Sequence, residues 1–124
     1  MIIGISGASG SIYGYRLLEK LRRRPEVELH LILTRSAERT AFLEDGRSIQ
    51  DFKALADFAY SVEDIGSRLA SGSFPTDGMV IAPCSVHSMS AIAAGLSSNL
   101  LIRAADVCLK ERLLIVSDGT QSSW

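Results

Sequence analysis

Residues Ile2–Ser11, with the sequence IIGISGASGS, largely determine the fold expected of this 124-residue chain. The β-branched apolar run Ile2–Ile5 is typical of a buried strand, and the small polar residues after it predict a loop. From Ile12 onward apolar side chains recur at helical spacing, with the preceding serine as the expected N-cap, until Pro25 stops the helix. The stretch 27–34 (VELHLILT) then alternates as a second strand. This order of elements predicts a right-handed βαβ unit with parallel strands.

The rest of the chain continues the alternation of helices and strands. Helical patterns cover 35–44, 48–56, 85–96 and 99–112, and short apolar runs that predict strands cover 58–61, 79–82 and 113–116. Elements alternating in this way predict an α/β fold, a three-layer αβα Rossmann-like domain with a parallel sheet. We expect one domain over residues 1–116 and an irregular tail over 117–124, because no linker or repeat interrupts the pattern.

The composition argues against several classes of protein. Lys and Arg number 13 against 14 Asp and Glu, a balance that disfavours a general nucleic-acid binder. No apolar run approaches the roughly 20 residues needed to span a bilayer, and the first residues lack the charged region of a signal peptide. Cys84 and Cys108 form no C-x-x-C pair, so we expect reduced, buried thiols and a cytoplasmic protein. Two histidines and two scattered cysteines do not suggest a metal site.

Three loops leave the carboxyl ends of expected strands, where α/β sheets bind ligands. In the first, Gly4, Gly7 and Gly10 read G-x-x-G-x-x-G, which is not the dinucleotide fingerprint, and the chain has no Gly-Lys pair for a Walker A loop. Glycines before a helix N-terminus can hold a phosphate through backbone amides, but they also make an ordinary tight turn. Both interpretations stay open.

The other two loops carry hydroxyl side chains. Ser85 and Ser88 either cap the helix that follows them or hold a polar part of a ligand. His87 has no carboxylate partner nearby in the sequence and is more typical of a solvated or capping residue than of a general base, while His30 is expected to pack in its strand. Thr34 stands where a nicotinamide enzyme would carry an acid for the ribose, which disfavours NAD and leaves room for FMN.

Two cations interrupt the apolar segment 100–110. Arg103 and Lys110 are seven residues apart, about two turns on one helix face. They either belong to a solvated stripe, with Asp106 pairing to one of them, or point at a phosphate.

Four segments together resemble the UbiX-type flavin prenyltransferases: 4–14 (GISGASGSIYG), 70–74 (ASGSF), 78–85 (GMVIAPCS) and 103–112 (RAADVCLKER). The resemblance covers about residues 1–112, in order. It implies a Rossmann-like domain, usually a homo-oligomer (a dodecamer), that transfers a dimethylallyl group from dimethylallyl phosphate to reduced FMN without a metal. It also implies that the prenylated flavin serves a UbiD-type decarboxylase.

The resemblance further implies roles for individual residues. Gly7, Ala8 and Ser9 would line the flavin, as would Thr34 and the stretch Ser85, Val86, His87 and Ser88. Ser9 would also touch the reacting centre, and Glu44 matches an acid that assists proton movement. Arg103 and Lys110 match cations that hold the phosphates of the flavin or the prenyl donor.

The sequence departs from the family after Arg112. Family chains continue through an Arg-Glu-x-Pro motif, another helix, a sixth strand and a tail with a Tyr and an Arg; here the final residues are 113–124 (LLIVSDGTQSSW). We therefore expect a domain without the family's last helix and strand, which binds flavin and transfers the prenyl group slowly or not at all. The alternatives are a non-catalytic FMN-binding fragment or pseudo-subunit, or a related decarboxylase of peptidyl cysteine, which 71–74 and 103–106 disfavour.

Overall fold

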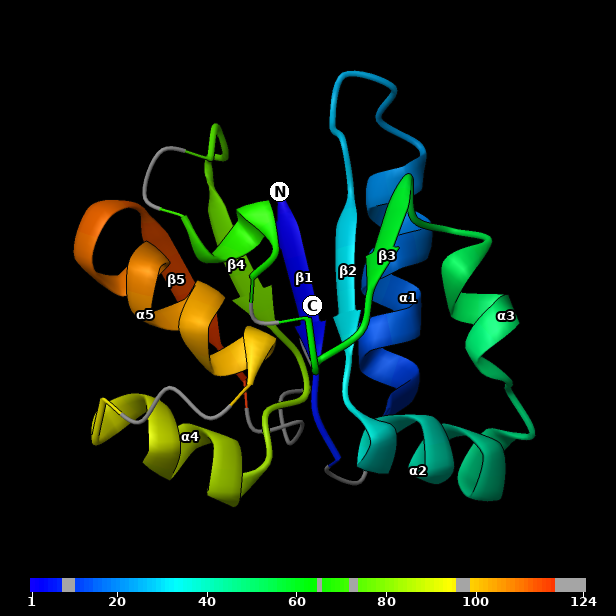
Figure 1. The fold of residues 1–124 in the computed structure, drawn as a ribbon. Coiled ribbons are helices and arrows are strands. Elements are labelled where there is room, and N and C mark those ends of the chain that lie inside the picture. The colour runs from blue at the N-terminus through cyan, green and yellow to red at the C-terminus, as the bar shows by residue number, and fades with distance from the viewer. Residues whose placement is uncertain (8–10, 65, 72–73, 96–98, 118–124) are drawn as a thin grey trace.

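Five parallel strands form one sheet in the computed structural model, which describes residues 1–7, 11–64, 66–71, 74–95 and 99–117. The order across the sheet is β3-β2-β1-β4-β5 (Figure 1). The strands are β1 (Ile2–Ile5), β2 (His30–Leu33), β3 (Phe58–Tyr60), β4 (Gly78–Ile81) and β5 (Leu113–Val116). The predicted parallel sheet is confirmed, and the order is that of a doubly wound fold.

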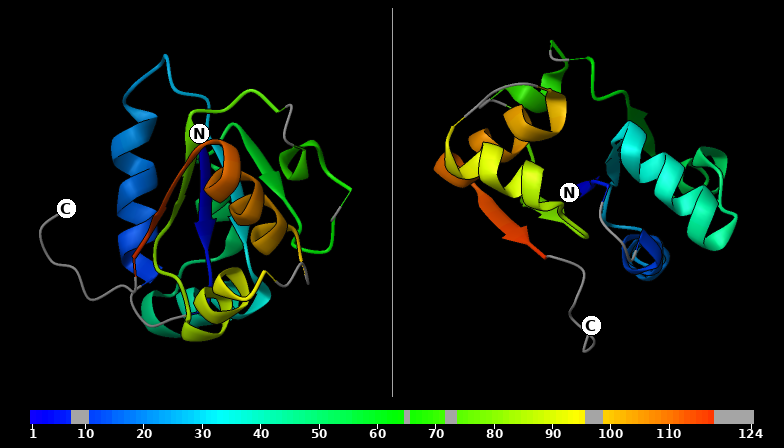
Figure 2. Two further views of the ribbon diagram at one scale, coloured as in Figure 1. Left: turned by 90° about the vertical axis from the view of Figure 1, so that its left-hand side faces the viewer. Right: turned by 90° about the horizontal axis from the view of Figure 1, so that it is seen from below.

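Helices cover both faces of the sheet, which confirms the predicted three layers (Figure 2). On one face lie α1 and α3, and on the other lie α5 and a short 3₁₀ helix, η1, while α2 and α4 lie along the carboxyl edge of the strands. Their bounds are α1 (Ser11–Arg22), α2 (Arg35–Asp45), α3 (Ile49–Lys53), η1 (Arg68–Ala70), α4 (Val86–Ala93) and α5 (Leu100–Glu111).

The strands alternate between two buried clusters, as the period of a strand requires. Ile3 and Ile5 of β1 pack with Leu18 of α1 in one cluster. Ile2 packs with Leu101 of α5 in the other. Because both faces are covered, β1 is buried along its whole length and reads as a continuous apolar run.

Some elements are shorter than the sequence predicts. The second strand begins at His30 rather than at residue 27, because the Leu29 N–H donates to Asp57 Oδ2 at 2.7 Å instead of to a neighbouring strand. The helix expected over 48–56 is limited to α3, which Ser48 begins through a capping box with Asp51. Ser11 is the first residue of α1 rather than the residue before it.

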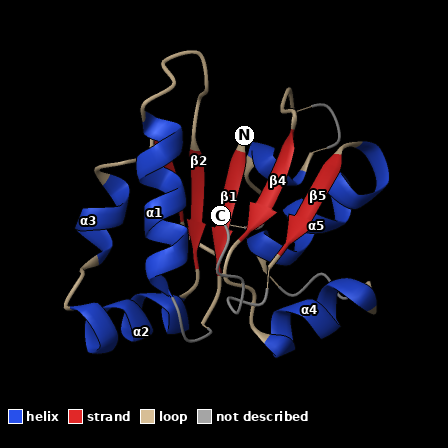
Figure 3. Ribbon diagram, turned by 180° about the vertical axis from the view of Figure 1, so that it is seen from behind, coloured by secondary structure: helices blue, strands red, loops and turns tan. Residues whose placement is uncertain are grey.

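β5 lies beside β4, with Leu114 opposite Met79. Leu114 packs against the cluster under α5, but Leu113 and Ile115 are 58% and 45% exposed. Seen from behind, α1 lies beside β2 and in front of β3, whereas no helix lies in front of β5 (Figure 3). One apolar face of β5 is therefore open among the described residues.

Candidate functional site

The order in which the chain adds strands to the sheet reverses between β1 and β4. The chain leaves β1 toward β2 on one side, and β4 continues to β5 on the other. Ligands of open α/β sheets bind at such a switch point, beyond the carboxyl ends of the strands. The candidate site is therefore where β1, β2 and β4 end, and we call the residues there the cradle: Ser6, Gly7, Thr34, Ser36 and 82–88.

Ser6 joins the two loops across the switch point. Its side chain is buried, and its Oγ accepts the Ser85 N–H at 2.7 Å. The Ser6 hydroxyl also lies 3.4 Å from Ser85 Oγ, to which it donates. In addition, the Ser6 N–H donates to the Pro83 carbonyl at 3.0 Å. These bonds hold the loop after β1 and the loop after β4 in one fixed arrangement.

Two glycines allow the backbone to come close at this edge. A Cβ added to Gly7 would overlap the Ser36 side chain in the first turn of α2. One added to Gly14 of α1 would overlap the Ala82 carbonyl oxygen. Any larger residue would push α1 or α2 away from the sheet, so both glycines are needed for the cradle to close.

Four helices begin at this edge: α1, α2, α4 and α5 (Figure 1). Thr34 Oγ1 caps α2 by accepting the Ala37 N–H, and Ser85 Oγ caps α4 by accepting the Ser88 N–H, both at 3.1 Å. Asn99 caps α5 in the same way. The first turns of α1, α4 and α5 contain no acidic residue. The free amides and the helix dipoles therefore make the cradle attractive to an anion.

The first turn of α4 offers apolar surface next to these amides. Val86 is 80% exposed, an unusual state for a valine. His87 is also exposed, as the sequence suggests for a solvated residue, and Ser88 is buried. The cradle thus combines anion-binding amides with an apolar side chain open to a ligand.

Arg103 and Lys110 lie at different ends of α5. Arg103 is in the first turn, at the cradle edge, and its buried Nε has no hydrogen-bond partner among the described residues. Lys110 is about 10 Å further along the axis, next to the start of β5, and its Nζ donates to Asp106 at 3.1 Å. The i,i+4 pairing considered for the solvated stripe is present, and one chain does not bring the two cations together.

Glu44 also lies away from the cradle. It is exposed in the last turn of α2, about 14 Å along the helix axis from Arg35. Ala8 and Ser9 lie outside the described residues. Of the predicted site residues, the structure brings together Gly7, Thr34 and Ser85 to Ser88, with Arg103 at the same edge.

Cys84 lies within the cradle, in the stretch 82–88, and burial disfavours the reactive thiolate form of its side chain. Its side chain is buried, and burial raises the pKa of the thiol, although the nearby Ser6 hydroxyl opposes the shift. Cys84 and Cys108 are unpaired, as the sequence predicts. Among the residues that the structure describes, no group of three His, Cys, Asp or Glu could hold a metal ion, and no helix is long and apolar enough to cross a membrane.

Sequence reasoning missed Ser6 and Ser36 as parts of the site. Ser6 follows the first predicted strand directly, and Ser36 is the second residue after the strand predicted over 27–34; these positions are the only signal that the sequence offers. Their role depends on β1 and β4 being neighbours and on Gly7 touching α2, neither of which is local in sequence.

The sequence model of the Flavoprotein family matches residues 1–120. The chain belongs to this family. It is 51% identical over 116 residues to a probable UbiX-like flavin prenyltransferase of Sedimentibacter hydroxybenzoicus, an alignment that covers 94% of this chain and 61% of the relative. The resemblance to UbiX-type flavin prenyltransferases is thereby confirmed, and the chain spans about three fifths of the length of the curated relative.

Two solved structures show the same arrangement. A dodecameric FMN-dependent UbiX-like decarboxylase from Escherichia coli O157:H7 superposes with a TM-score of 0.91 at 45% identity, covering 93% of this chain and 63% of that one. A UbiX in complex with FMN and dimethylallyl pyrophosphate superposes with a TM-score of 0.89 at 36% identity, covering 98% and 66%.

Proposed function

We propose that this chain binds FMN in the cradle and is the flavin-binding part of a flavin prenyltransferase, which moves a dimethylallyl group from dimethylallyl phosphate to reduced FMN. The observation that carries the proposal is that four helices begin at the carboxyl edge of the sheet, where the Ser6–Ser85 link joins the loops of the switch point. The relatives named for this reaction support it.

The residues present fit FMN. Its phosphate is an anion suited to the amides at the helix N-termini and to the hydroxyls of Thr34 and Ser85. Its ring is largely apolar and matches the exposed side chain of Val86. We assign Gly7, Ala8, Ser9 and the stretch 85–88 to the flavin, with Ser9 next to the reacting centre. Reduced FMN supplies the nucleophilic ring that accepts the prenyl group.

Arg103 is assigned to a phosphate. A buried guanidinium nitrogen without a partner needs an acceptor, since an unpaired buried donor costs about 1–3 kcal/mol. A cation held at this edge stabilises the negative charge that grows on the phosphate as it leaves the allyl group. The role of this chain is thus to hold both phosphates and fix the reacting partners.

Glu44 and Lys110 fit the proposed reaction only if each reaches the cradle of a neighbouring copy of this chain. Each lies at the far end of a helix that begins at the cradle of its own chain. Phe42 and Leu43, next to Glu44, are 62% and 76% exposed, which is typical of residues that another chain covers. We propose that the chain assembles with further copies, like the dodecameric relative, and that Glu44 and Lys110 then complete neighbouring cradles. Leu43→Lys should reduce the mass measured by light scattering, while Lys53→Glu on the exposed side of α3 should not.

The product would be used by a UbiD-type decarboxylase. The prenylated flavin is a cofactor rather than an end product, so a second enzyme must take it up. A cytoplasmic location fits the two unpaired thiols. The alternative of a peptidyl-cysteine decarboxylase is not favoured, because the prenyltransferase relative shares half of its aligned residues with this chain.

Titration of the chain with FMN, riboflavin and free phosphate tests the cradle. The fluorescence of FMN should be quenched on binding. FMN should also bind at least tenfold more tightly than riboflavin, which lacks the phosphate that the amides hold. Thr34→Val, which removes the cap hydroxyl but keeps the shape of the side chain, should reduce the affinity for FMN more than the affinity for riboflavin. Equal affinities for the two flavins would contradict the phosphate site.

A further inference from the structure

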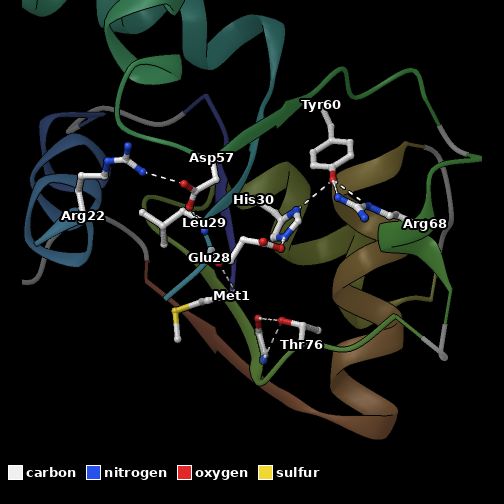
Figure 4. A network of polar contacts seen from close by, with 10 residues as sticks. Met1, Arg22, Glu28, Leu29, His30, Asp57, Tyr60, Arg68 and Thr76 are labelled. Carbon is white, nitrogen blue, oxygen red and sulfur yellow. Dashed lines mark hydrogen bonds and ion pairs between the residues drawn. The ribbon is translucent and has the colours of Figure 1, made fainter. Parts of the chain in front are cut away.

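His30 is a buried ionisable group that the proposed reaction does not use. It is 2% exposed, stacks on Phe58 at 4.9 Å between ring centroids and meets the edge of Phe74 at 5.1 Å. The predicted packing role is confirmed, but both ring nitrogens also have polar partners (Figure 4). Nε2 lies 2.7 Å from Glu28 Oε1, and Nδ1 lies 2.9 Å from the Tyr60 hydroxyl.

The chemistry of the partners fixes the direction of each hydrogen bond. An ionised carboxylate only accepts, so His30 Nε2 carries a proton and donates it to Glu28. The guanidinium of Arg68 only donates, and it donates twice to Tyr60 Oη, at 3.2 and 3.1 Å. Both lone pairs of the Tyr60 oxygen are then used, so its proton points to His30 Nδ1, which must accept. His30 is therefore neutral, with its proton on Nε2.

We propose that Arg68, Tyr60, His30 and Glu28 form a pH-sensitive latch, which is complete only while His30 is neutral and which loosens η1 from the sheet when Nδ1 takes up a proton. A protonated Nδ1 must donate to Tyr60 Oη, which already accepts twice from Arg68. The Tyr60 proton then loses its acceptor, and Arg68 must give up at least one bond.

The latch lies where three elements meet. Arg68 is the first residue of η1 and also lies over the rings of Phe58 and Phe74, at 5.0 and 5.4 Å. The next residue, Leu69, is buried in the cluster that α5 forms with the sheet. Two residues after Tyr60, the Val62 carbonyl accepts the N–H of Leu100, the first residue of α5. Release of Arg68 would therefore loosen the contact of η1 with both β3 and α5.

Several charges face His30 from the surrounding elements. Glu28 favours its protonation, as does the more distant Asp57, whereas Arg68 and the Met1 ammonium oppose it. Burial is the largest influence and lowers the pKa of His30 below its ordinary value. The unfolded chain thus takes up a proton near pH 6.5 that the folded chain refuses, and folding stability falls as the pH drops from about 7.5 through that range.

Nitrogen NMR of the imidazole tests the latch. The chain has two histidines, so His87→Asn leaves His30 as the single imidazole. Long-range proton–nitrogen correlation at pH 7.5 should show the neutral tautomer with the proton on Nε2. In the same background Tyr60→Phe should raise the titration midpoint, because the neutral ring loses the hydroxyl that donates to Nδ1, and it should reduce the loss of Tm between pH 7.5 and 5.5.

Tyr15→Phe is the matched control, since this half-buried tyrosine on α1 packs edge-on against Phe52 away from the latch. Arg68 is exposed, so Arg68→Gln gives a second measurement should Tyr60→Phe not fold, and it should also raise the midpoint. A cationic ring or an Nδ1–H tautomer at pH 7.5, or a midpoint that falls in either variant, would overturn the latch. No flavin is involved, so the outcome is independent of the proposed function.

Discussion

Removal of the Ser6 hydroxyl should weaken both the fold and the cradle. In Ser6→Ala the Ser85 N–H loses its 2.7 Å acceptor, and Ser85 Oγ loses a 3.4 Å donor. An unpaired buried donor costs about 1–3 kcal/mol; because Ser85 is only half-buried, we expect about 1–2 kcal/mol. For a domain of this size that corresponds to a fall in Tm of about 4–8 °C. The loop after β4 should also lose its fixed position, and we expect the affinity for FMN to fall about tenfold.

The measurements are urea unfolding and fluorescence titration with FMN. Ser90→Ala is the matched control, because Ser90 is exposed on the same helix, α4, and should change stability by less than about 0.5 kcal/mol. If Ser6→Ala is as stable as this control and binds FMN equally well, the Ser6–Ser85 link does not organise the site.

The remaining predictions concern the glycine contact, a carboxylate and the phosphate cation. Gly7→Ala should reduce FMN affinity at least tenfold by titration, and Ser36→Gly in the same chain should restore part of it, because it removes the side chain that the new Cβ meets. Asp57→Asn should cost about 0.5–1 kcal/mol at pH 7 by urea unfolding, since Asp57 is partly screened by solvent. The Leu29 N–H and then Arg22 lower the pKa of Asp57 (Figure 4), so its stabilisation is present above about pH 4 and is lost as the pH falls through the lowered value; the difference between variant and parent should vanish there. Arg103→Ala should slow formation of prenylated FMN by roughly 10² to 10³, measured by mass spectrometry of flavin extracted after anaerobic incubation with reduced FMN and dimethylallyl phosphate. An unchanged rate would remove Arg103 from the site.

Local patterns predicted the elements that local forces determine. The run Ile2–Ile5, the glycine loop and the spacing after Ile12 predict β1 and α1; the structure shows β1 with these bounds and α1 from Ser11, although α1 ends at Arg22, before Pro25. Pairing of Asp106 with Lys110 was equally predictable, because residues four apart meet on a helix. These features depend on contacts within one or two turns of chain.

Contacts between distant segments could not be predicted from the sequence alone. β2 starts only at His30 because the Leu29 N–H donates to Asp57, a residue 28 positions further along the chain. The role of Ser6 depends on Ser85, 79 residues away, and on a crossover that puts β4 beside β1. Neither contact leaves a periodic pattern in the sequence. Sequence reasoning therefore began β2 too early, at residue 27, and assigned no role to Ser6.

The length of the helices explains why only part of the predicted site comes together. Residues that cap a helix at the carboxyl edge of the sheet, such as Thr34 and Ser85, lie at the cradle. Residues at the far end of a helix are carried away from it by 1.5 Å per residue, and Glu44 and Lys110 are both in last turns. The exposed apolar pair beside Glu44 lies where a second chain could cover it. Under the proposed function, one chain holds the flavin, and Glu44 and Lys110 would reach the prenyl donor from neighbouring copies of the chain.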